Sequence, residues 1–353
     1  MKIALLNDSH WGSKNDAKSH LDHQEKFYYD VFFPYLKENN INTLVHLGDV
    51  IDRRKFINFN TAYRFKKFMF KLWEEKIDTH IILGNHDTYF KNTNEVNSID
   101  ALCKSFDGVN EPWIYHGPKV VTFDGVDILF LPWICDDNYK QSVESIENSK
   151  TDLCFGHLEI KGFEMHNGLR SLHGLDSKVF KKFDKVISGH FHTKSDDGQI
   201  HYLGTQYELN WSDYKQTKGF HIFDTETREI EFIKNPHTLH NKLVYDDTKN
   251  DYKTFDLTPF NNHYVKVIVI RKDDPEMFDK LIERLYNEVN VYEVQIIDDF
   301  TSIKASVRSD ILEMGEDTHT FLNNYIDQLD IDLDKQKLKD YIKELYVETE
   351  SNT

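Results

Sequence analysis

The sequence predicts a layered α/β fold followed by a smaller β-α-β unit, and two observations lead to this fold class. In the first two-thirds of the 353 residues, short apolar runs alternate with stretches of helical periodicity, as in sheets covered by helices. After about residue 240 the pattern becomes one strand, one helix and one strand. With 39% hydrophobic and 14% aromatic residues, the chain can bury a sizeable core.

The predicted elements follow in chain order. Strands at 2–8, 42–49 and 79–87 are separated by helices at 21–38 and 60–76, and the first helix is expected to break or restart near Pro34. Later strands are predicted at 119–123, 127–133, 152–157, 185–190, 200–205 and 219–224. The final unit consists of a strand at 263–270, a helix at 275–288 and a strand at 292–298.

Composition excludes several classes of protein. No apolar run approaches the roughly 20 residues of a membrane span, and the short apolar start leads directly into Asp8 and His10, unlike a signal peptide. Three widely spaced cysteines indicate reduced thiols in a cytoplasm and no thiolate zinc site. The net charge of −17 argues against nonspecific adhesion to nucleic acid or anionic membranes. From Asp310 onward, however, 12 Asp and Glu face only 4 Lys, so much of this charge lies far from the motifs below.

Polar groups follow five of the predicted strands, each directly after an apolar run. The motifs are D-S-H at 8–10, G-D-V-I-D at 48–52, G-N-H-D at 84–87, G-H at 156–157 and G-H-F-H at 189–192. Any one of them could be an ordinary strand-to-loop turn, since Gly, Asn and Asp favour turns. Five in order are unlikely by accident. Because ligand sites in open α/β sheets lie beyond the carboxyl ends of strands, we expect these side chains to form one site.

The residue types indicate the chemistry of this site. Carboxylates, an amide oxygen and imidazoles without a thiolate suit manganese, iron, zinc or magnesium. Seven such side chains exceed what one ion needs. Two ions that share a bridging carboxylate, roughly 3.5–4 Å apart, fit better, and such a pair suits the hydrolysis of phosphate esters.

This series of motifs resembles the calcineurin-like metallophosphoesterase superfamily over about residues 1–225. Within it, the chain is most similar to the SbcD-type nuclease subunits of recombination and repair complexes, especially those of T4-like phages. Two further stretches carry the likeness, P-W-I-C-D-D-N at 132–138 and the segment 202–224, in which Gln206 stands where proline is common. The resemblance implies a β-sandwich flanked by helices as a nuclease domain at 1–240, a capping domain at 255–312 and C-terminal helices at 316–353.

The resemblance also implies a role for each motif residue. Asp8, His10, Asp49 and His192 would hold the first metal ion, and Asp49, Asn85, His157 and His190 the second, with Mn²⁺ expected and Mg²⁺ as the alternative. His86 would stabilise the transition state and protonate the leaving oxygen. Asp87 would orient His86 or its loop from outside the ligand sphere. Asp52, also found in bacterial members, stands where some relatives carry a histidine.

The implied function is a two-metal DNA phosphodiesterase, an exo- or endonuclease that acts with a coiled-coil ATPase of the SbcC type in recombination, repair and replication. It would work in the cytoplasm, or in that of the host if a phage encodes it. A Ser/Thr protein phosphatase is one alternative, but those enzymes read G-N-H-E where this chain has Asp87 and lack the β-α-β cap. A non-catalytic scaffold is the other, and the intact motifs disfavour it.

Two regions are candidate partner surfaces. The helix at 60–76 carries an apolar stripe of Phe65, Phe68, Met69, Leu72 and Trp73, which either packs on its own sheet or, with residues 98–106, pairs two copies into a homodimer within a heterotetramer. Two amphipathic stripes follow near the C-terminus: Phe321, Leu322, Tyr325, Ile326 and Leu329, then Leu338, Tyr341, Ile342, Leu345 and Tyr346. They either fold back on the chain or dock onto the ATPase.

Overall fold

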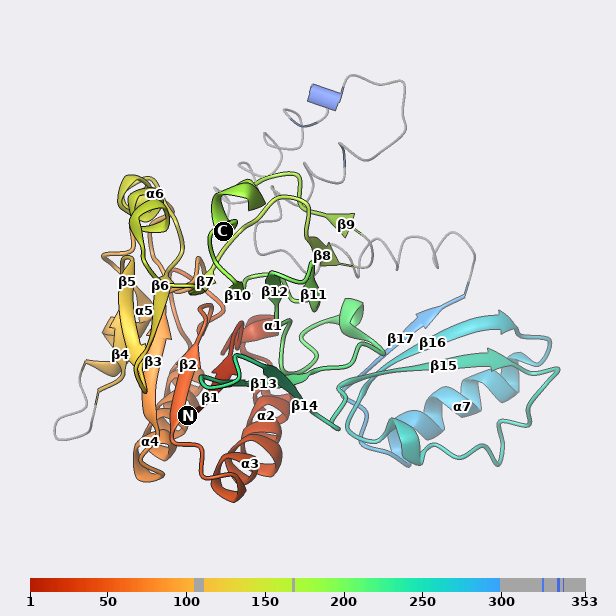
Figure 1. Ribbon diagram of the computed structural model, residues 1–353. Coiled ribbons are helices and arrows are strands. Elements are labelled where there is room, and N and C mark those ends of the chain that lie inside the picture. The colour runs from red at the N-terminus through yellow and green to blue at the C-terminus, as the bar shows by residue number, and fades with distance from the viewer. Residues whose placement is uncertain (105–110, 167–168, 299–325, 327–334, 337–338, 340–353) are drawn as a thin grey trace. The chain divides into compact units, whose positions relative to one another are not determined.

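The computed structural model describes residues 1–104, 111–166, 169–298, 326, 335, 336 and 339. The chain forms two compact units (Figure 1). The first comprises Met1–Leu209 and Thr217–His237, and the second comprises Asn210–Gln216 together with the chain from Thr238 onward. This division differs from the predicted boundaries of 1–240 and 255–312, because the second unit begins earlier and includes a short segment that interrupts the first unit near its C-terminal end.

The first unit is a sandwich of two six-stranded sheets. The first sheet has the order β14-β13-β1-β2-β3-β4, and the second β11-β12-β10-β7-β6-β5. The strands of the first sheet are β1 (Lys2–Leu6), β2 (Thr43–His46), β3 (Asp78–Ile82), β4 (Trp113–Tyr115), β13 (Gly219–Asp224) and β14 (Ile230–Lys234). Those of the second are β5 (Lys119–Phe123), β6 (Val126–Leu131), β7 (Leu153–His157), β10 (Lys185–Gly189), β11 (Ser195–Asp196) and β12 (Ile200–Tyr202). A small pair, β8 (Glu164–His166) and β9 (Leu169–Arg170), follows β7.

Three apolar layers hold this sandwich together. Leu5, Val45, Phe130 and Phe155 are among the residues that fill the space between the sheets. Each sheet also buries its outer face, the first beneath helices and the second beneath residues such as Ile146. The central strands are therefore buried on both sides, which explains their nearly continuous apolar runs.

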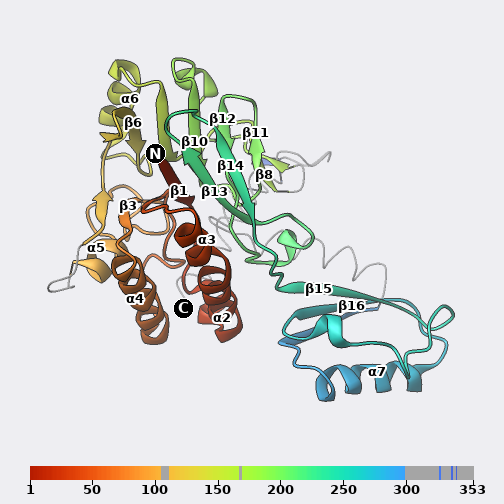
Figure 2. The ribbon, with the colours of Figure 1, turned by 60° about the horizontal axis from the view of Figure 1, so that its bottom comes forward.

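The outer face of the first sheet is covered by helices on one side (Figure 2). These include α2 (Lys18–Phe27), a π-helix (Tyr28–Phe32), α3 (Phe33–Glu38) and α4 (Phe59–Glu74). The break expected near Pro34 takes the form of this π-helix, which leads directly into α3 with Pro34 as its second residue. The shorter helices are α1 (Ser13–Asp16), α5 (Ser98–Cys103) and α6 (Tyr139–Asn148), and 3₁₀ turns lie at Ser177–Phe180, Trp211–Asp213 and Thr258–Phe260.

The apolar stripe of α4 packs on its own sheet. Phe65, Phe68, Met69 and Leu72 are buried in the core of the first unit. Trp73 is 37% exposed. The intramolecular interpretation of the stripe is therefore confirmed, while a second copy could contact only the exposed remainder of this helix.

The second unit is a three-stranded parallel sheet with one helix along a face (Figure 2). Its elements are β15 (His240–Asp246), β16 (Tyr264–Arg271), α7 (Pro275–Asn287) and β17 (Glu293–Ile297). The side chain of Asp274 caps α7 by accepting the N–H of Met277. In the inserted segment, the ring of Trp211 lies 4.7 Å from the ring of His240, and the Lys266 Nζ lies 4.4 Å from the Trp211 ring.

Little of the C-terminal segment is described. Ile326 is helical and buried. The other residues of the two predicted stripes, Phe321, Leu322, Tyr325, Leu329, Leu338, Tyr341, Ile342, Leu345 and Tyr346, lie outside the described residues, as do residues 105–106. Within the described part of the chain, no helix has the length and apolarity needed to cross a membrane.

Candidate metal centre

The motif residues of both sheets meet at one end of the sandwich. β1, β2 and β3 are adjacent and parallel in the first sheet, and β7 and β10 are adjacent and parallel in the second. Their carboxyl ends bring together two clusters in which the potential ligand atoms lie within 4.8 Å of one another. The first cluster consists of Asp8, His10 and His192. The second consists of Asp49, His157 and His190, and Asn85 contacts it.

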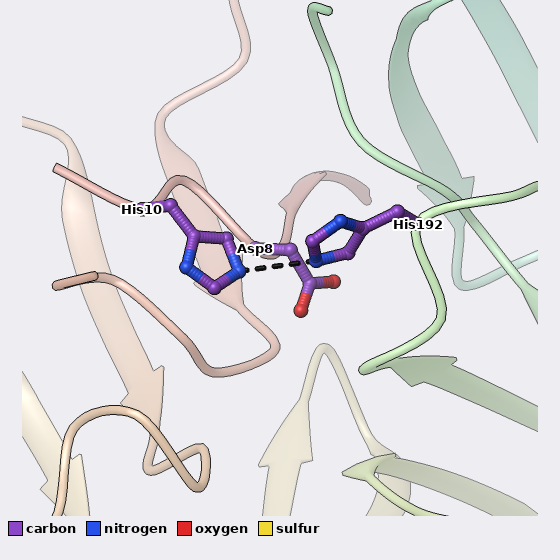
Figure 3. A group of neighbouring side chains, drawn as sticks. All are labelled: Asp8, His10 and His192. Carbon is purple, nitrogen blue, oxygen red and sulfur yellow. Dashed lines mark hydrogen bonds between the residues drawn. The ribbon is translucent and has the colours of Figure 1, made fainter. Parts of the chain in front are cut away.

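In the first cluster, two imidazoles face each other beside a carboxylate (Figure 3). The Nε2 atoms of His10 and His192 are 3.1 Å apart. The Asp8 oxygens accept the backbone N–H of His190 at 3.0 and 3.1 Å. The Nδ1 of His10 lies 3.2 Å from an oxygen of Asp52. A carboxylate beside a ring nitrogen can fix the orientation of a histidine, and Asp52 lies in such a position here.

In the second cluster, oxygen atoms face the lone pair of an imidazole. The Nδ1 of His157 must carry a proton, because it donates to the Leu47 carbonyl at 2.8 Å. In a neutral ring, Nε2 then presents a lone pair to the Asn85 oxygen at 2.9 Å and to an Asp49 oxygen at 3.2 Å. The Nδ1 of His190 lies 3.1 Å from the same Asn85 oxygen. Electron pairs that face one another in a buried site favour a cation among them, so this donor set fits a metal ion.

Asp49 lies where the two clusters meet. The oxygen that approaches His157 also lies 4.0 Å from the Nε2 of His10. The other oxygen accepts the backbone N–H of His86 at 2.7 Å. One carboxylate oxygen therefore faces both clusters, as a bridging ligand requires.

The backbone at these positions is unusual for residues with side chains. Asp8, His10, Asp49 and His190 have φ values of 47°, 45°, 55° and 86°. Such conformations are unfavourable outside glycine and are concentrated at functional sites. Gly84 is required for a different reason, because a Cβ atom there would lie 2.2 Å from an Asp49 oxygen.

His86 lies beside both clusters without belonging to either. Its Nδ1 donates to the Asp52 carbonyl at 2.5 Å, so Nε2 is the remaining atom for chemistry. Among the described residues, this Nε2 has no hydrogen-bond partner. The His86 ring stands edge-on to the ring of His10 at 4.9 Å, and His10, Asp52 and His86 form a third group with potential ligand atoms close together.

Asp87 fastens the loop after β3 to the loop after β2. Its two oxygens accept the backbone N–H groups of Gly84, Asp49, Val50 and Ile51 at 2.9–3.1 Å. Burial, with a smaller effect of the Asp49 charge, raises the pKa of Asp87 to about 6, while the N–H groups of Gly84 and Ile51 oppose this rise. The Asp87 side chain thus orients the loops that carry Asp49 and His86 by binding backbone N–H groups of those loops.

A buried polar network behind the first cluster could not be read from the motifs. The Ser9 hydroxyl contacts the His46 Nε2 at 2.7 Å and accepts from the Gln206 amide at 3.0 Å. The Ser9 carbonyl accepts from the Tyr207 hydroxyl at 2.6 Å, and the Gln24 amide donates to the carbonyls of Ser9 and His10. Burial lowers the pKa of His46 to about 3, so this ring is neutral in the network.

Fold and site together define a phosphoesterase of the metal-dependent, two-sheet class. The sequence profile of the calcineurin-like phosphoesterases matches residues 1–194, and the chain belongs to this family. It is 35% identical over 358 residues to exonuclease subunit 1 of Enterobacteria phage T4, with 99% of both chains covered. It is 24% identical to the SbcD subunit of the nuclease SbcCD from Staphylococcus epidermidis, covering 73% of this chain and 79% of that one. For the SbcD subunit of Staphylococcus saprophyticus the identity is 24%, with 65% and 67% covered.

Proposed function

We propose that the chain is a two-metal DNA phosphodiesterase. Asp8, His10, Asp49 and His192 would hold one divalent ion, and Asp49, Asn85, His157 and His190 the other. The observation that carries this assignment is the single Asp49 oxygen that faces both His157 and His10. When bound, such a pair of ions lowers the pKa of the attacking water and stabilises the charge that develops on the phosphate.

His86 acts as the general acid in this proposal. The Asp52 carbonyl accepts a hydrogen bond from the Nδ1–H of His86 and fixes the ring. A second proton, on Nε2, can then pass to the leaving oxygen of the phosphodiester. After the step, the neutral ring keeps its Nδ1 proton and its orientation. His86 supplies no metal ligand in this assignment, which separates its role from that of Asn85, its neighbour in the chain.

DNA is the proposed substrate. The relatives named above are an exonuclease subunit and two nuclease subunits, and the first matches this chain over nearly its full length. The donor set of oxygen and imidazole ligands suits Mn²⁺, with Mg²⁺ as the alternative. The proposed location is the cytoplasm, or that of the host if a phage encodes the protein.

Linear duplex DNA and a phosphoprotein, each supplied with Mn²⁺, test the substrate directly. We expect degradation of the DNA, no release of phosphate from the protein and loss of all activity with a chelator. Phosphoprotein hydrolysis without DNA cleavage would favour the phosphatase alternative. No hydrolysis of DNA or of a generic phosphodiester, by the chain alone or with its ATPase, would favour the scaffold.

The proposed partner is a coiled-coil ATPase of the SbcC type, bound through residues 316–353. The support is the amphipathic sequence of this segment and the names of the relatives, each of which is a subunit. Deletion of residues 316–353 should abolish co-purification with the ATPase and leave metal binding and basal hydrolysis intact. Complex formation that survives the deletion would exclude this segment as the docking site.

The proposed assembly is a homodimer within a heterotetramer, paired through α4 and the region of α5. Trp73 and Phe70 are exposed on α4, and their rings lie 5.2 Å apart. Light scattering at micromolar concentration should show a dimer, and replacement of both aromatic residues by serine should shift it to monomer. A monomer in the unmodified protein would contradict the proposal.

A further inference from the structure

A pocket lies at the open edge of the sandwich, where β14 and β11 end the two sheets. Its volume is about 580 Å³. Lys185 of β10, His201 of β12, His221 of β13 and Ile230 of β14 contribute to its lining, together with Lys194 before β11. Pockets of this size hold small molecules in many proteins.

The alternation of side chains directs both histidines into the space between the sheets. On β12, Ile200 and Tyr202 pack in the outer core of the second sheet, so His201 faces the opposite side. On β13, Phe220 and Ile222 pack beneath the helices of the first sheet, so His221 faces inward as well. The residues that occupy this layer farther along the sheets are apolar.

Both imidazoles have unmatched ring nitrogens. His221 is only 2% exposed, and within the described part of the chain neither of its nitrogens has a hydrogen-bond partner. The same holds, among the described residues, for Nε2 of His201. Burial, reinforced by Lys194, lowers the pKa of His221 to about 3, and burial also lowers the pKa of His201. A neutral imidazole offers one N–H and one lone pair, and leaving such groups unmatched is unfavourable.

The pocket also has cations, carboxylates and an aromatic ring. The Lys185 Nζ donates to the Arg228 carbonyl at 2.8 Å, and the Lys194 Nζ lies 4.8 Å from the centroid of the Phe232 ring. The His221 ring lies 5.1 Å from the same ring. Asp196 and Glu229 add carboxylates to the lining. The Glu231 carboxylate faces the other side of the sheet, where it accepts from the Tyr35 hydroxyl.

We propose that this pocket binds a phosphorylated small molecule of mononucleotide size. Two ammonium groups supply charge-assisted hydrogen bonds for a phosphate. The imidazoles and the carboxylates supply acceptors and donors for the polar edges of a base and sugar, next to an aromatic face. This combination suits a nucleotide better than a bare anion, which would leave the imidazole lone pairs without donors. The site goes beyond the proposed nuclease function and does not depend on it.

Calorimetric titration of the full chain in the presence of a chelator tests the site, since no divalent ion is then bound at the metal centre. The probes are a deoxynucleoside monophosphate, inorganic phosphate and the unphosphorylated deoxynucleoside. We expect saturable binding of the monophosphate, at least tenfold tighter than that of either fragment. Absence of saturable binding would overturn the proposal, and equal affinity for phosphate and nucleotide would overturn the ligand class.

Three variants locate the binding. Lys194→Ala and His221→Phe should each weaken monophosphate binding at least tenfold. Lys234→Ala, a change on the exposed end of β14, should leave it unchanged. Thermal unfolding checks that each variant is folded. If His221→Phe does not fold, the result for Lys194→Ala, a change at an exposed residue, is used alone. Binding that both variants leave intact would place the nucleotide elsewhere and refute the assignment.

Discussion

The two clusters of the metal centre are held in different ways. Side chains from distant elements support the first cluster: Gln24 of α2 and Tyr207 reach the backbone at Ser9 and His10, and Lys218 donates to the His192 carbonyl at 3.0 Å. The second cluster rests on contacts among strand ends, where Asp87 accepts four backbone N–H groups and the Leu47 carbonyl holds His157.

Because of this difference, substitutions near the two clusters should affect metal binding to different extents. The second cluster depends on residues within its own motifs, so changes there should alter metal binding directly. The first cluster depends on supporting side chains from other elements (here called struts), namely Gln24, Tyr207 and Lys218. Losing one of them leaves every ligand in place, so changes there should be milder. Four variants follow: Asp87 and Tyr207 test the two sides of the contrast, Asp49 belongs to both clusters, and His86 belongs to neither.

The largest effect is expected for Asp49→Ala. This variant removes the oxygen that faces both clusters, so metal content should fall from two ions per chain to fewer than one. Hydrolysis should fall by more than the roughly 10²–10³-fold loss typical of removing one electrostatic group. Elemental analysis with a nuclease assay measures both. Retention of two ordered ions would show that the clusters do not share Asp49.

For His86→Ala we expect loss of hydrolysis without loss of metal. General acid catalysis typically contributes about 10²–10⁴-fold, and the variant removes a proton donor but no ligand of either cluster. The same two measurements decide the outcome. If metal content falls together with activity, the group formed by His10, Asp52 and His86 is a ligand set, and the assignment of His86 as the acid is wrong.

Asp87→Ala should weaken the second cluster more than the first, because it loosens the loop of Asp49, which both clusters share. It leaves four buried N–H groups without an acceptor, at about 1–3 kcal/mol for each one that water does not reach. Loss of an outer partner typically lowers metal affinity about 10–100-fold. Metal titration should therefore show a larger loss of affinity at the second site than at the first, and denaturant unfolding should show a lower stability. Asp87→Asn, which keeps an acceptor oxygen, should lose less. Equal weakening of both sites would remove the distinction between the clusters.

The smallest effect is expected for Tyr207→Phe. It deletes one hydroxyl that donates to the Ser9 carbonyl, a change worth about 0.5–1.5 kcal/mol of stability. Affinity at the first site should fall less than tenfold, with the second site unchanged. Tyr202→Phe is the matched control, because its buried hydroxyl donates to the Leu158 carbonyl, just after β7, and not to the backbone of the first cluster. If both variants change metal affinity alike, the strut to Ser9 has no specific role.

The same contrast explains how much of the site was predictable. Asn85, His86 and Asp87 follow a buried strand directly, so the sequence places them at a strand end, and the structure brings them to the clusters. The struts give no such signal. Tyr207 contacts Ser9 across 198 positions of sequence, and its apolar ring reads as an ordinary core residue. Such contacts depend on tertiary packing, which no local pattern encodes.

The fold was predictable to a similar depth. The alternation of strands and helices predicted most of the central strands, since these are apolar on both faces. β14 and β15 escaped prediction because polar residues interrupt them, such as Glu231 in the edge strand β14 and Lys242 in β15. The missed β15 is also why the second unit begins earlier than the predicted 255.

The short segment Asn210–Gln216 limits how the gene of this protein can recombine with genes of its relatives. Trp211 packs with His240 and Lys266 in the second unit, although the chain on both sides of the segment belongs to the first. The second unit is therefore discontinuous in the gene. Recombination with one breakpoint near codon 238 would exchange the sheet of the second unit and its helix. It would leave Trp211 in a chain whose positions 240 and 266 come from another gene. Exchange of this unit between relatives requires a coordinated change at a second place, so the two units are expected to descend together.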